Sequence, residues 1–321
     1  YTRIKELVAH VNELYQGNVS MKKCIFCGRT EAEFEKENCW TEEHIIPEAL
    51  GNERLKIYNV CKDCNSGLGT YVDNYFVNNM LVKIIRQTLG IRGQSGKVPN
   101  AFKEGTDKAG HRIQVNDKFQ PKIVPYIEQN ENKLRIVAPT KKEAKEMAVK
   151  KLSRMKSSEK TIQDVLDRID QTPSHFSQPE IQYDIEIDFN QFFLEALKIA
   201  FEYAVYKLGD NYLKDLRAIE IQKHLKCAIK GELKKKSVEF YGVCIAPEKI
   251  SRSLERVKGL NCHLLMIHPN AENKLISEVF LFMEPILSFS VLISDDASQY
   301  CSSMQEFTDI VQIKSISNLS K

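Results

Sequence analysis

The sequence predicts an α+β protein in which a small, metal-stapled segment near the N-terminus precedes a larger mixed α/β module. Two Cys-x-x-Cys pairs, Cys24 with Cys27 and Cys61 with Cys64, predict the metal site that holds this segment together. Four thiolates in two close pairs can complete the tetrahedral shell of a zinc ion and hold together a segment too small to have its own core. Farther along the chain, stretches with helical periodicity and stretches of alternating apolar and polar residues predict helices and strands.

The first part of the chain is predicted to contain a helix, a hairpin and a second helix. Residues 2–16 carry apolar side chains along one helical face. A hairpin is expected between the two cysteine pairs, followed by a helix from Lys62 to Leu89 that Gly90 ends. Residues 90–110 are rich in glycine and polar residues, which predicts a linker.

The middle of the chain is predicted to hold short strands and then two helices. Alternating residues at 122–127 and 133–137 indicate strands. Thr140 begins a capping-box pattern, which predicts the start of a basic helix over residues 141–156. A second helix is expected at residues 161–169.

The last part of the chain is predicted to contain a core helix and a sheet. After a proline-flanked boundary at residues 173–179, alternation predicts a strand at 181–187. Residues 190–208 form a helix that is apolar around most of its circumference, which predicts burial in the core. A shorter basic helix and four or five strands between residues 238 and 316 complete the chain. The most apolar stretch, residues 279–293, is too short to cross a bilayer and is predicted to form two consecutive buried strands.

These elements group into three predicted domains. Residues 1–90 would hold the N-terminal helix and the stapled segment, and residues 91–178 a linker and a small α+β region with the basic helix. Residues 179–321 would form a C-terminal α+β domain for recognition or regulation. A chain of 321 residues is long enough for two domains or three small ones.

Groups of a different chemistry stand between and beside the cysteine pairs. Glu43 and His44 are adjacent, and Asn65 directly follows Cys64. A carboxylate and an amide oxygen suit a hard ion such as Mg²⁺ or Mn²⁺, whereas thiolates suit Zn²⁺. Neighbouring residues on a regular strand point to opposite faces, so the chain must bend near residues 45–47 if Glu43 and His44 are to face one site. The sequence therefore predicts two metal sites in one segment.

This arrangement resembles the HNH, or ββα-metal, endonucleases, especially the subtype that a four-cysteine zinc site braces, as in phage recombination endonucleases and bacterial HNH restriction or defence nucleases. The likeness covers roughly residues 21–75. It implies a ββα-metal finger near the N-terminus, with a structural zinc ion bound by Cys24, Cys27, Cys61 and Cys64.

The resemblance also implies a role for each site residue. His44 would be the general base, and Glu43 with Asn65 would bind the catalytic Mg²⁺ or Mn²⁺. Asn59 matches the family's middle Asn, which orders the loop between the strands, although Asn52 could also fill that role. Glu43 and Asn65 replace a commoner Asp and His, and the family accommodates both variants.

The chemistry of these residues agrees with phosphodiester hydrolysis. With an unperturbed pKa of about 6.5, His44 can be neutral near physiological pH and accept a proton from water. A metal ion can stabilise charge on the phosphate and on the departing 3′ oxygen. The resemblance therefore implies a metal-dependent endonuclease that hydrolyses DNA and leaves a 5′ phosphate and a 3′ hydroxyl. Bacterial restriction or anti-phage defence is the expected biological role, with the C-terminal module giving target recognition or regulation.

Two alternatives from other classes stay open. The first is a nuclease effector that a ligand activates, with a C-terminal module that senses a nucleotide. The second is a noncatalytic zinc-ribbon protein that binds DNA, in which His44 would have no chemical role.

Composition constrains the partners without identifying the function. The net charge of +3 is weakly basic, but residues 141–160 and 214–236 each carry eight Lys or Arg against three acids, and both runs could contact phosphates or simply be solvated. The expected partners are DNA and, in addition, a small-molecule or protein activator; no membrane contact is expected, and a homo-oligomer is allowed. Five further cysteines are scattered and predict free thiols in a reducing cytoplasm.

Overall fold

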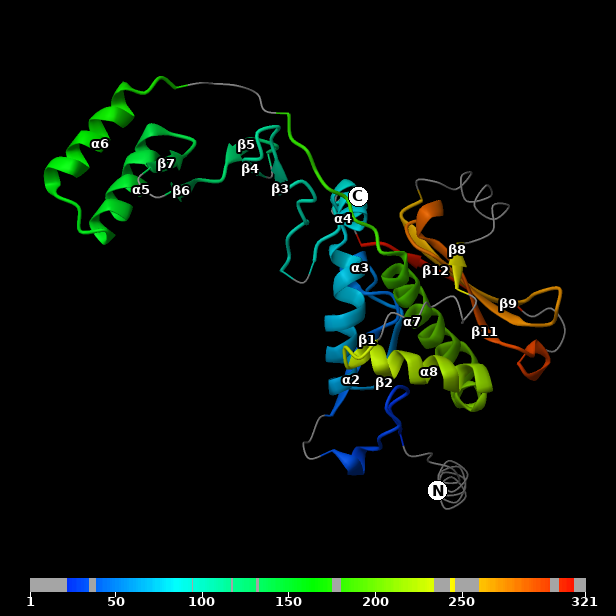
Figure 1. Ribbon diagram of the computed structural model, residues 1–321. Coiled ribbons are helices and arrows are strands. Elements are labelled where there is room, and N and C mark those ends of the chain that lie inside the picture. The colour runs from blue at the N-terminus through cyan, green and yellow to red at the C-terminus, as the bar shows by residue number, and fades with distance from the viewer. Residues whose placement is uncertain are drawn as a thin grey trace, which may run out of the picture. The chain divides into compact units, whose positions relative to one another are not determined.

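The computed structural model divides into two compact units, residues 1–99 with 187–321 and residues 100–186 (Figure 1). The structure describes residues 22–34, 39–93, 95–116, 118–130, 133–174, 180–233, 243–245, 260–300 and 306–314. The helix predicted at residues 2–16 lies outside the described residues.

The first unit begins with the finger, which is the described part of residues 22–89. Its elements are β1 (Trp40–His44), β2 (Lys56–Cys61), α2 (Lys62–Leu68), α3 (Asn74–Asn78) and α4 (Met80–Leu89). β1 and β2 form the predicted hairpin, with Trp40 opposite Cys61 and His44 opposite Lys56. α2 starts directly after β2, which gives the expected strand, strand and helix order.

The single helix predicted from Lys62 to Leu89 is wrong, because the helical path changes twice. A π-helical turn spans Gly69–Asp73. Asn79 then leaves the helical conformation (ψ 141°), and its side-chain oxygen accepts a hydrogen bond from the N–H of Leu81 at 3.0 Å. Asn is a strong N-cap residue because its side chain competes for backbone donors, so it starts α4 rather than continuing α3. Gly90 ends α4 in a left-handed conformation (φ 66°), as predicted.

A five-stranded antiparallel sheet and two helices complete the first unit. The sheet has the order β12-β9-β10-β11-β8. Its strands are β8 (Cys244–Ile245), β9 (Cys262–Pro269), β10 (Leu275–Phe280), β11 (Ser288–Ser294) and β12 (Phe307–Gln312), and the helices are α7 (Phe189–Leu208) and α8 (Leu216–Ile229). The two buried strands predicted within residues 279–293 are confirmed as the end of β10 and β11. Short 3-10 helices lie at Glu31–Glu33, Glu48–Leu50, Gly209–Lys214, Pro285–Leu287 and Ala297–Gln299.

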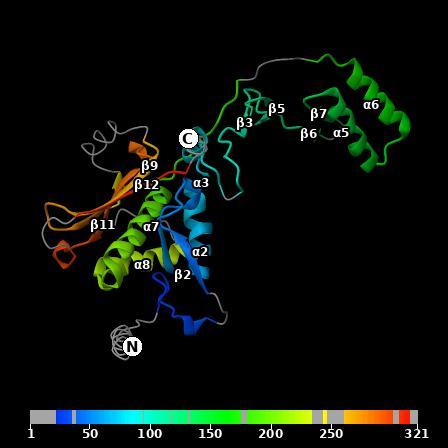
Figure 2. The same ribbon diagram turned by 180° about the vertical axis from the view of Figure 1, so that it is seen from behind.

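α7 is the central element of the first unit. It packs against α3 and the π-helical turn of the finger and also against β10 and β11 of the sheet, and both ribbon views place it between them (Figures 1 and 2). The ring centroids of Phe26 and Phe201 lie 5.6 Å apart, and those of Phe76 and Phe192 lie 4.8 Å apart. The predicted burial of this helix is therefore confirmed, and the finger supplies part of its cover.

The finger and the C-terminal sheet share one hydrophobic core. The predicted division placed residues 1–90 and 179–321 in separate domains, whereas the structure packs these two segments together. The reason is the burial of α7: apolar residues cover most of its circumference, and Glu195, Lys198 and Glu202 are buried with them, so neither the sheet nor the finger can cover the helix alone.

The second unit, residues 100–186, contains short strands and two helices. These are β3 (Glu104–Thr106), β4 (Arg112–Val115), β5 (Pro121–Ile123), β6 (Tyr126–Asn130), β7 (Lys133–Val137), α5 (Lys141–Arg154) and α6 (Glu159–Gln171). Thr140 caps α5 by accepting a hydrogen bond from the N–H of Glu143 at 3.2 Å, which confirms the predicted start. The strand predicted at 122–127 is instead the end of β5 and the start of β6. The strand predicted at 181–187 is wrong, because the described residues there form a single bridge, between Gln182 and Thr106.

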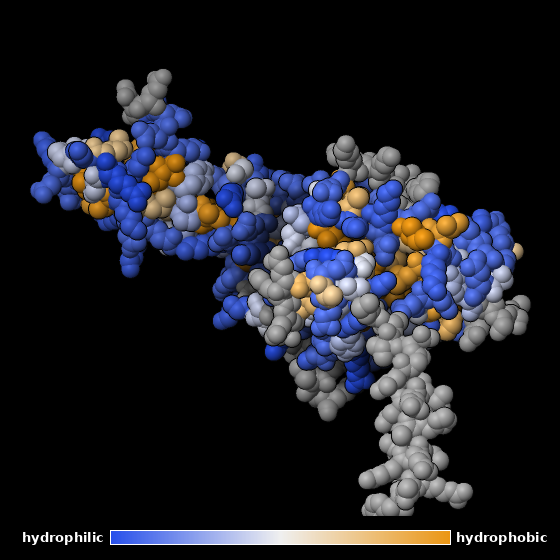
Figure 3. All heavy atoms as spheres, turned by 90° about the horizontal axis from the view of Figure 1, so that it is seen from below, coloured by the Kyte–Doolittle hydropathy of each residue, from blue (hydrophilic) through white to orange (hydrophobic). Residues whose placement is uncertain are grey.

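Apolar residues cover little of the visible surface. Hydrophilic residues dominate the face shown in Figure 3, and hydrophobic residues gather in smaller patches. Within the described ranges, no helix has the length and apolar character that crossing a membrane requires.

His263 on β9 joins the sheet to the finger. Its ring is fully buried, and Nε2 donates to the carbonyl of Leu50 at 3.1 Å while Nδ1 accepts from the N–H of Phe282 at 3.1 Å. These two bonds require the neutral imidazole. Burial lowers the pKa of His263 from 6.5 to about 4.

We expect His263 to make the protein less stable in acid. Because protonation is easier in the unfolded chain, its contribution is complete above pH 6.5 and falls by about 3 kcal/mol as pH drops toward 4. Chemical denaturation at several pH values should give a shallower pH dependence over this window for His263→Gln than for the native chain. An unchanged dependence would contradict this account of the ring.

Candidate metal centre and active site

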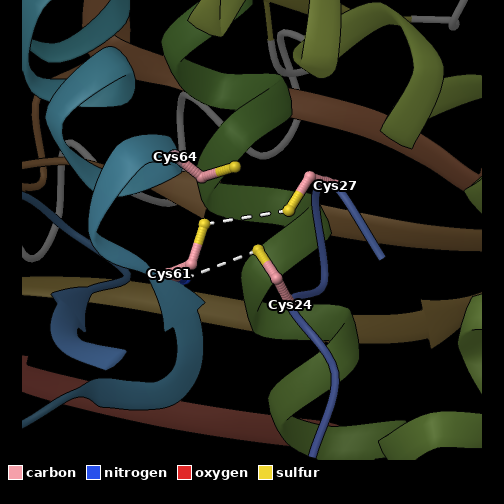
Figure 4. Close-up of side chains that lie close together, drawn as sticks. All are labelled: Cys24, Cys27, Cys61 and Cys64. Carbon is pink, nitrogen blue, oxygen red and sulfur yellow. Dashed lines mark hydrogen bonds between the residues drawn. The ribbon is translucent and has the colours of Figure 1, made fainter. Parts of the chain in front are cut away.

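The four predicted zinc ligands meet at one point (Figure 4). Cys24 and Cys27 lie in the turn before the hairpin, Cys61 ends β2, and Cys64 lies in the first turn of α2. Their sulfur atoms all lie within 4.8 Å of one another, and those of Cys27 and Cys61 are 3.7 Å apart. A tetrahedral zinc ion with bonds of about 2.3 Å would separate its sulfur ligands by about 3.8 Å. The cluster therefore fits a structural zinc ion.

Polar neighbours favour negative charge on these sulfur atoms. The N–H of Cys61 donates to Cys24 Sγ at 3.4 Å, and Arg29 Nε donates to Cys27 Sγ at 3.4 Å. A hydrogen bond from the Cys64 thiol lowers the pKa of Cys24 to about 4, and the same bond raises the pKa of Cys64. These contacts favour the thiolate form of Cys24. Zinc would replace the shared proton, and Arg29 would offset part of the remaining negative charge.

We expect Cys61→Ser to lose zinc and to unfold the finger together, because metal binding and folding are coupled in such sites. Elemental analysis and thermal unfolding should show both losses. Cys227→Ser is the matched control, because Cys227 lies outside the cluster, and it should keep its zinc. A zinc-free Cys61→Ser protein with native stability would contradict the claim that a bound zinc ion holds the finger folded.

Three of the four predicted catalytic residues border one cavity of about 550 Å³, and Asn59 is not among its lining residues. Glu43, His44 and Asn65 line it, and Asp73 and Arg86 lie on its wall as well. The chain bends after β1 at residues 45–46, as predicted, and the register of the hairpin also shifts between Thr41 and Glu43. These two irregularities explain how adjacent residues reach the same cavity.

His44 is well placed to accept a proton. Its side chain is partly buried. Burial lowers the pKa of His44, and the nearby positive charge of Lys56 lowers it further. Its imidazole is therefore neutral at physiological pH, which is the form that a general base needs.

Asn65 is oriented by the strand beside it. Its amide nitrogen donates to the carbonyl of Glu42 at 3.0 Å. The amide oxygen is consequently the atom that a metal ion could use.

Asn52, rather than Asn59, orders the loop between the strands. The buried Asn52 side chain donates to the carbonyls of Ile46 at 2.7 Å and Leu55 at 2.9 Å, and it accepts from the N–H of Leu55 at 2.9 Å. Asn59 uses its backbone carbonyl to accept from Ile25 at 3.0 Å. Its side chain is not among those that line the cavity.

Glu43 pairs with a lysine from the distant helix α7. Lys198 Nζ lies 2.7 Å from the Glu43 carboxylate and 3.2 Å from that of Glu202, and it donates to the carbonyl of His44 at 2.9 Å. Lys198 is fully buried and Glu43 is 4 % exposed. Burial raises the pKa of Glu43, although Lys198 opposes this. Burial also lowers the pKa of Lys198, but Asp73 and the nearby glutamates outweigh it and raise that pKa well above its ordinary value.

Sequence reasoning missed Lys198 and Asp73. Lys198 is 154 positions from His44, and the apolar character of its helix indicated packing alone. A usable signal was the presence of Glu195, Lys198 and Glu202 within that apolar helix, at spacings that share one face. Asp73 follows Asn65 by two helical turns, which places both on the cavity side.

The cavity also offers donors for a hard cation. Glu43, Asp73 and Asn65 all present oxygen atoms, and Asp73 Oδ1 is buried without a hydrogen-bond partner in the described structure. Within the described ranges, the cysteines are the one group in which three or more His, Cys, Asp or Glu ligand atoms already converge. Mg²⁺ commonly binds through one or two carboxylates, with water and substrate phosphate completing its shell. The donor set therefore fits such an ion.

We expect Lys198→Met to destabilise the protein by about 3–5 kcal/mol, because it leaves buried carboxylates without their cation. Lys207→Met is the control in the same helix, because Lys207 pairs with Asp309 in a partly exposed position, and it should cost less than about 1 kcal/mol. Urea unfolding of both variants gives the comparison. Equal losses of stability in the two variants would contradict the prediction that a buried cation contributes more to stability than a partly exposed one.

When the chain is compared with models of protein families, one family model matches a region within the finger. Residues 24–81 match a family model described as HNH endonuclease. The match begins at the first cysteine of the cluster and includes the hairpin, Asn65 and Asp73, and it confirms the resemblance predicted from the cysteine pairs and the Glu-His sequence. Neither the curated proteins nor the solved structures gave a match to the chain.

Proposed function

Because residues 24–81 form an HNH endonuclease region, we propose that the protein is a metal-dependent endonuclease that hydrolyses phosphodiester bonds of DNA. The observation that carries the proposal is the meeting of Glu43, His44 and Asn65 in one cavity beside the zinc-binding cluster. Each of these residues has the chemistry that hydrolysis needs, and hydrogen bonds from Asn65 to the carbonyl of Glu42 and from Lys198 of α7 to the carbonyl of His44 hold them in place.

In the proposed reaction, His44 removes a proton from a water molecule, whose oxygen then attacks the phosphorus atom. The bond between phosphorus and the 3′ oxygen breaks with its electron pair going to that oxygen, which takes a proton from solvent water, so the products are a 5′ phosphate and a 3′ hydroxyl. Bound Mg²⁺ or Mn²⁺ would stabilise negative charge on the phosphate and on the leaving oxygen. Glu43, Asn65 and Asp73 are the residues that would hold the ion.

Lys198 has a positioning role in this proposal. Its ammonium group donates to the carbonyl of His44 and pairs with Glu43, so one buried cation fixes the backbone beside the base and a side chain of the metal site. Asn52 has the loop-ordering role, which the resemblance had given to Asn59. Preorganisation of this kind lowers the cost of reaching the transition state.

The biological part of the proposal rests on the resemblance. On the strength of that resemblance the proposal includes a role in bacterial restriction or anti-phage defence and a cytoplasmic location, a compartment in which free cysteines such as Cys39, Cys227 and Cys262 stay reduced. The C-terminal sheet and the second unit are the candidates for target recognition or regulation, since the small finger has few groups to read bases.

We expect His44→Ala to reduce cleavage of plasmid DNA by a factor of about 10²–10⁴, the usual contribution of a general base. The assay should use Mg²⁺ and Mn²⁺ and compare chains with equal zinc content. His268→Ala is the control, because this histidine lies on β9 and pairs with Glu278 outside the cavity. Its cleavage rate should match that of the native chain.

Undiminished cleavage by His44→Ala would contradict the proposed base. If the native chain with zinc bound cuts neither unmodified nor phage-derived DNA, the ligand-activated effector or the noncatalytic DNA-binding protein becomes the better description. A thermal-shift screen with nucleotides would then separate these two alternatives, because a ligand that binds the folded state raises its melting temperature.

A further inference from the structure

Arg86 on α4 is a buried cation without an anionic partner. Its side chain lines the active-site cavity and is 3 % exposed. One terminal nitrogen donates to the carbonyl of Val77 at 3.1 Å, while Nε is buried with no hydrogen-bond partner in the described structure. Among the described residues no carboxylate forms a salt bridge with Arg86, whereas Lys198 pairs with Glu43, Asp73 and Glu202.

A structural role accounts for part of this arrangement. The bond to Val77 satisfies a carbonyl at the end of α3, where Asn79 interrupts the helix. A guanidinium group has five N–H donors, however, and a neutral carbonyl does not compensate a buried charge. The remaining donors and the charge call for an anion in the cavity.

A second cation borders the same cavity. Lys97 follows a tight turn in which the N–H of Gly93 donates to the carbonyl of Lys97 at 2.9 Å. The turn approaches Arg86 closely, because a Cβ atom at Gly93 would lie 3.1 Å from a terminal nitrogen of the guanidinium. Lys97 itself is exposed. The cavity thus has a cationic wall in addition to His44 and the oxygen donors.

We propose that Arg86 and Lys97 form a phosphate-binding subsite of this cavity, in which Arg86 holds a phosphate of the nucleic-acid backbone adjacent to the one that is cleaved. The planar fork of an arginine matches two phosphate oxygens, and a buried arginine meets its ligand with little loss of side-chain freedom. The identity of the ligand rests on the proposed nuclease function, whereas the need for an anion rests on the buried charge alone. A free nucleotide could present the same phosphate chemistry.

The test measures binding, not cleavage. Fluorescence anisotropy with a labelled DNA duplex gives the slope of the logarithm of DNA affinity against the logarithm of salt concentration. The buffer contains no divalent ions, so that DNA is not cut, and no chelator, so that zinc is not removed. Each phosphate contact with duplex DNA contributes roughly 0.9 to this slope. Arg86→Gln and Lys97→Gln should each lower its magnitude by about that amount. Arg92→Gln is the matched control, because Arg92 is exposed and lies outside the cavity, and its slope should be native.

A thermal-shift experiment with inorganic phosphate and with a mononucleotide distinguishes the source of the phosphate group. If either compound stabilises the native chain but not Arg86→Gln, the subsite binds free phosphates. If neither does while the salt slope falls in both subsite variants, it binds the nucleic-acid backbone.

Native salt slopes for Arg86→Gln and Lys97→Gln, with no phosphate-dependent stabilisation, would overturn the proposal and leave Arg86 with its structural bond to Val77. If Arg86→Gln does not fold, the salt slope of Lys97→Gln is the deciding measurement, because Lys97 is exposed. A native slope for that variant rejects the proposed subsite. Because cleavage is not measured, the outcome is separate from the nuclease test. Reduced slopes in a protein that never cuts DNA would keep the subsite and reject the nuclease.

Discussion

The ion pair between the buried ammonium group of Lys198 and Glu43 is the interaction on which both the candidate active site and the packing of the first unit depend. The ammonium group joins Glu43 and the carbonyl of His44 to α7, and α7 in turn packs on β10 and β11 of the C-terminal sheet. A charge placed at such a depth is stable only while its partners stay in position. Movement of the finger away from α7 would leave the carboxylate of Glu43 without its cation, while Lys198 would keep Glu202 of its own helix, so the two segments are expected to hold together.

The same cluster sets the charge around the cavity. Glu195 and Glu202 are fully buried with Lys198, and Asp73 lies close to it. Burial raises the pKa of both glutamates well above the ordinary value, which favours their protonated forms. One lysine therefore does not face four full negative charges. The carboxylates of Glu43 and Asp73, nearest to the cavity, are the ones that a bound cation would stabilise.

Local sequence patterns predicted the elements of the site but not the contacts that support it. The cysteine pairs, the Glu-His step and the apolar circumference of α7 are short-range signals, and the zinc cluster, the hairpin and the buried helix follow from them. The pairing of Glu43 with Lys198 joins distant segments, so no local spacing reveals it. Asn79 shows a further limit, since one side-chain hydrogen bond outweighed the helical periodicity on both sides. Asn52 and Asn59 could be separated only once their partners were known.

The most direct test of this account is hydrogen exchange, followed by mass spectrometry, on the full chain before and after removal of zinc. If the finger and α7 form one cooperative unit through Lys198, amides of α7 should lose protection together with those of β1 and β2, although no zinc ligand lies in α7. Retention of native protection in α7 after the finger has opened would contradict the account, because it would show that the helix and the sheet are stable without the finger.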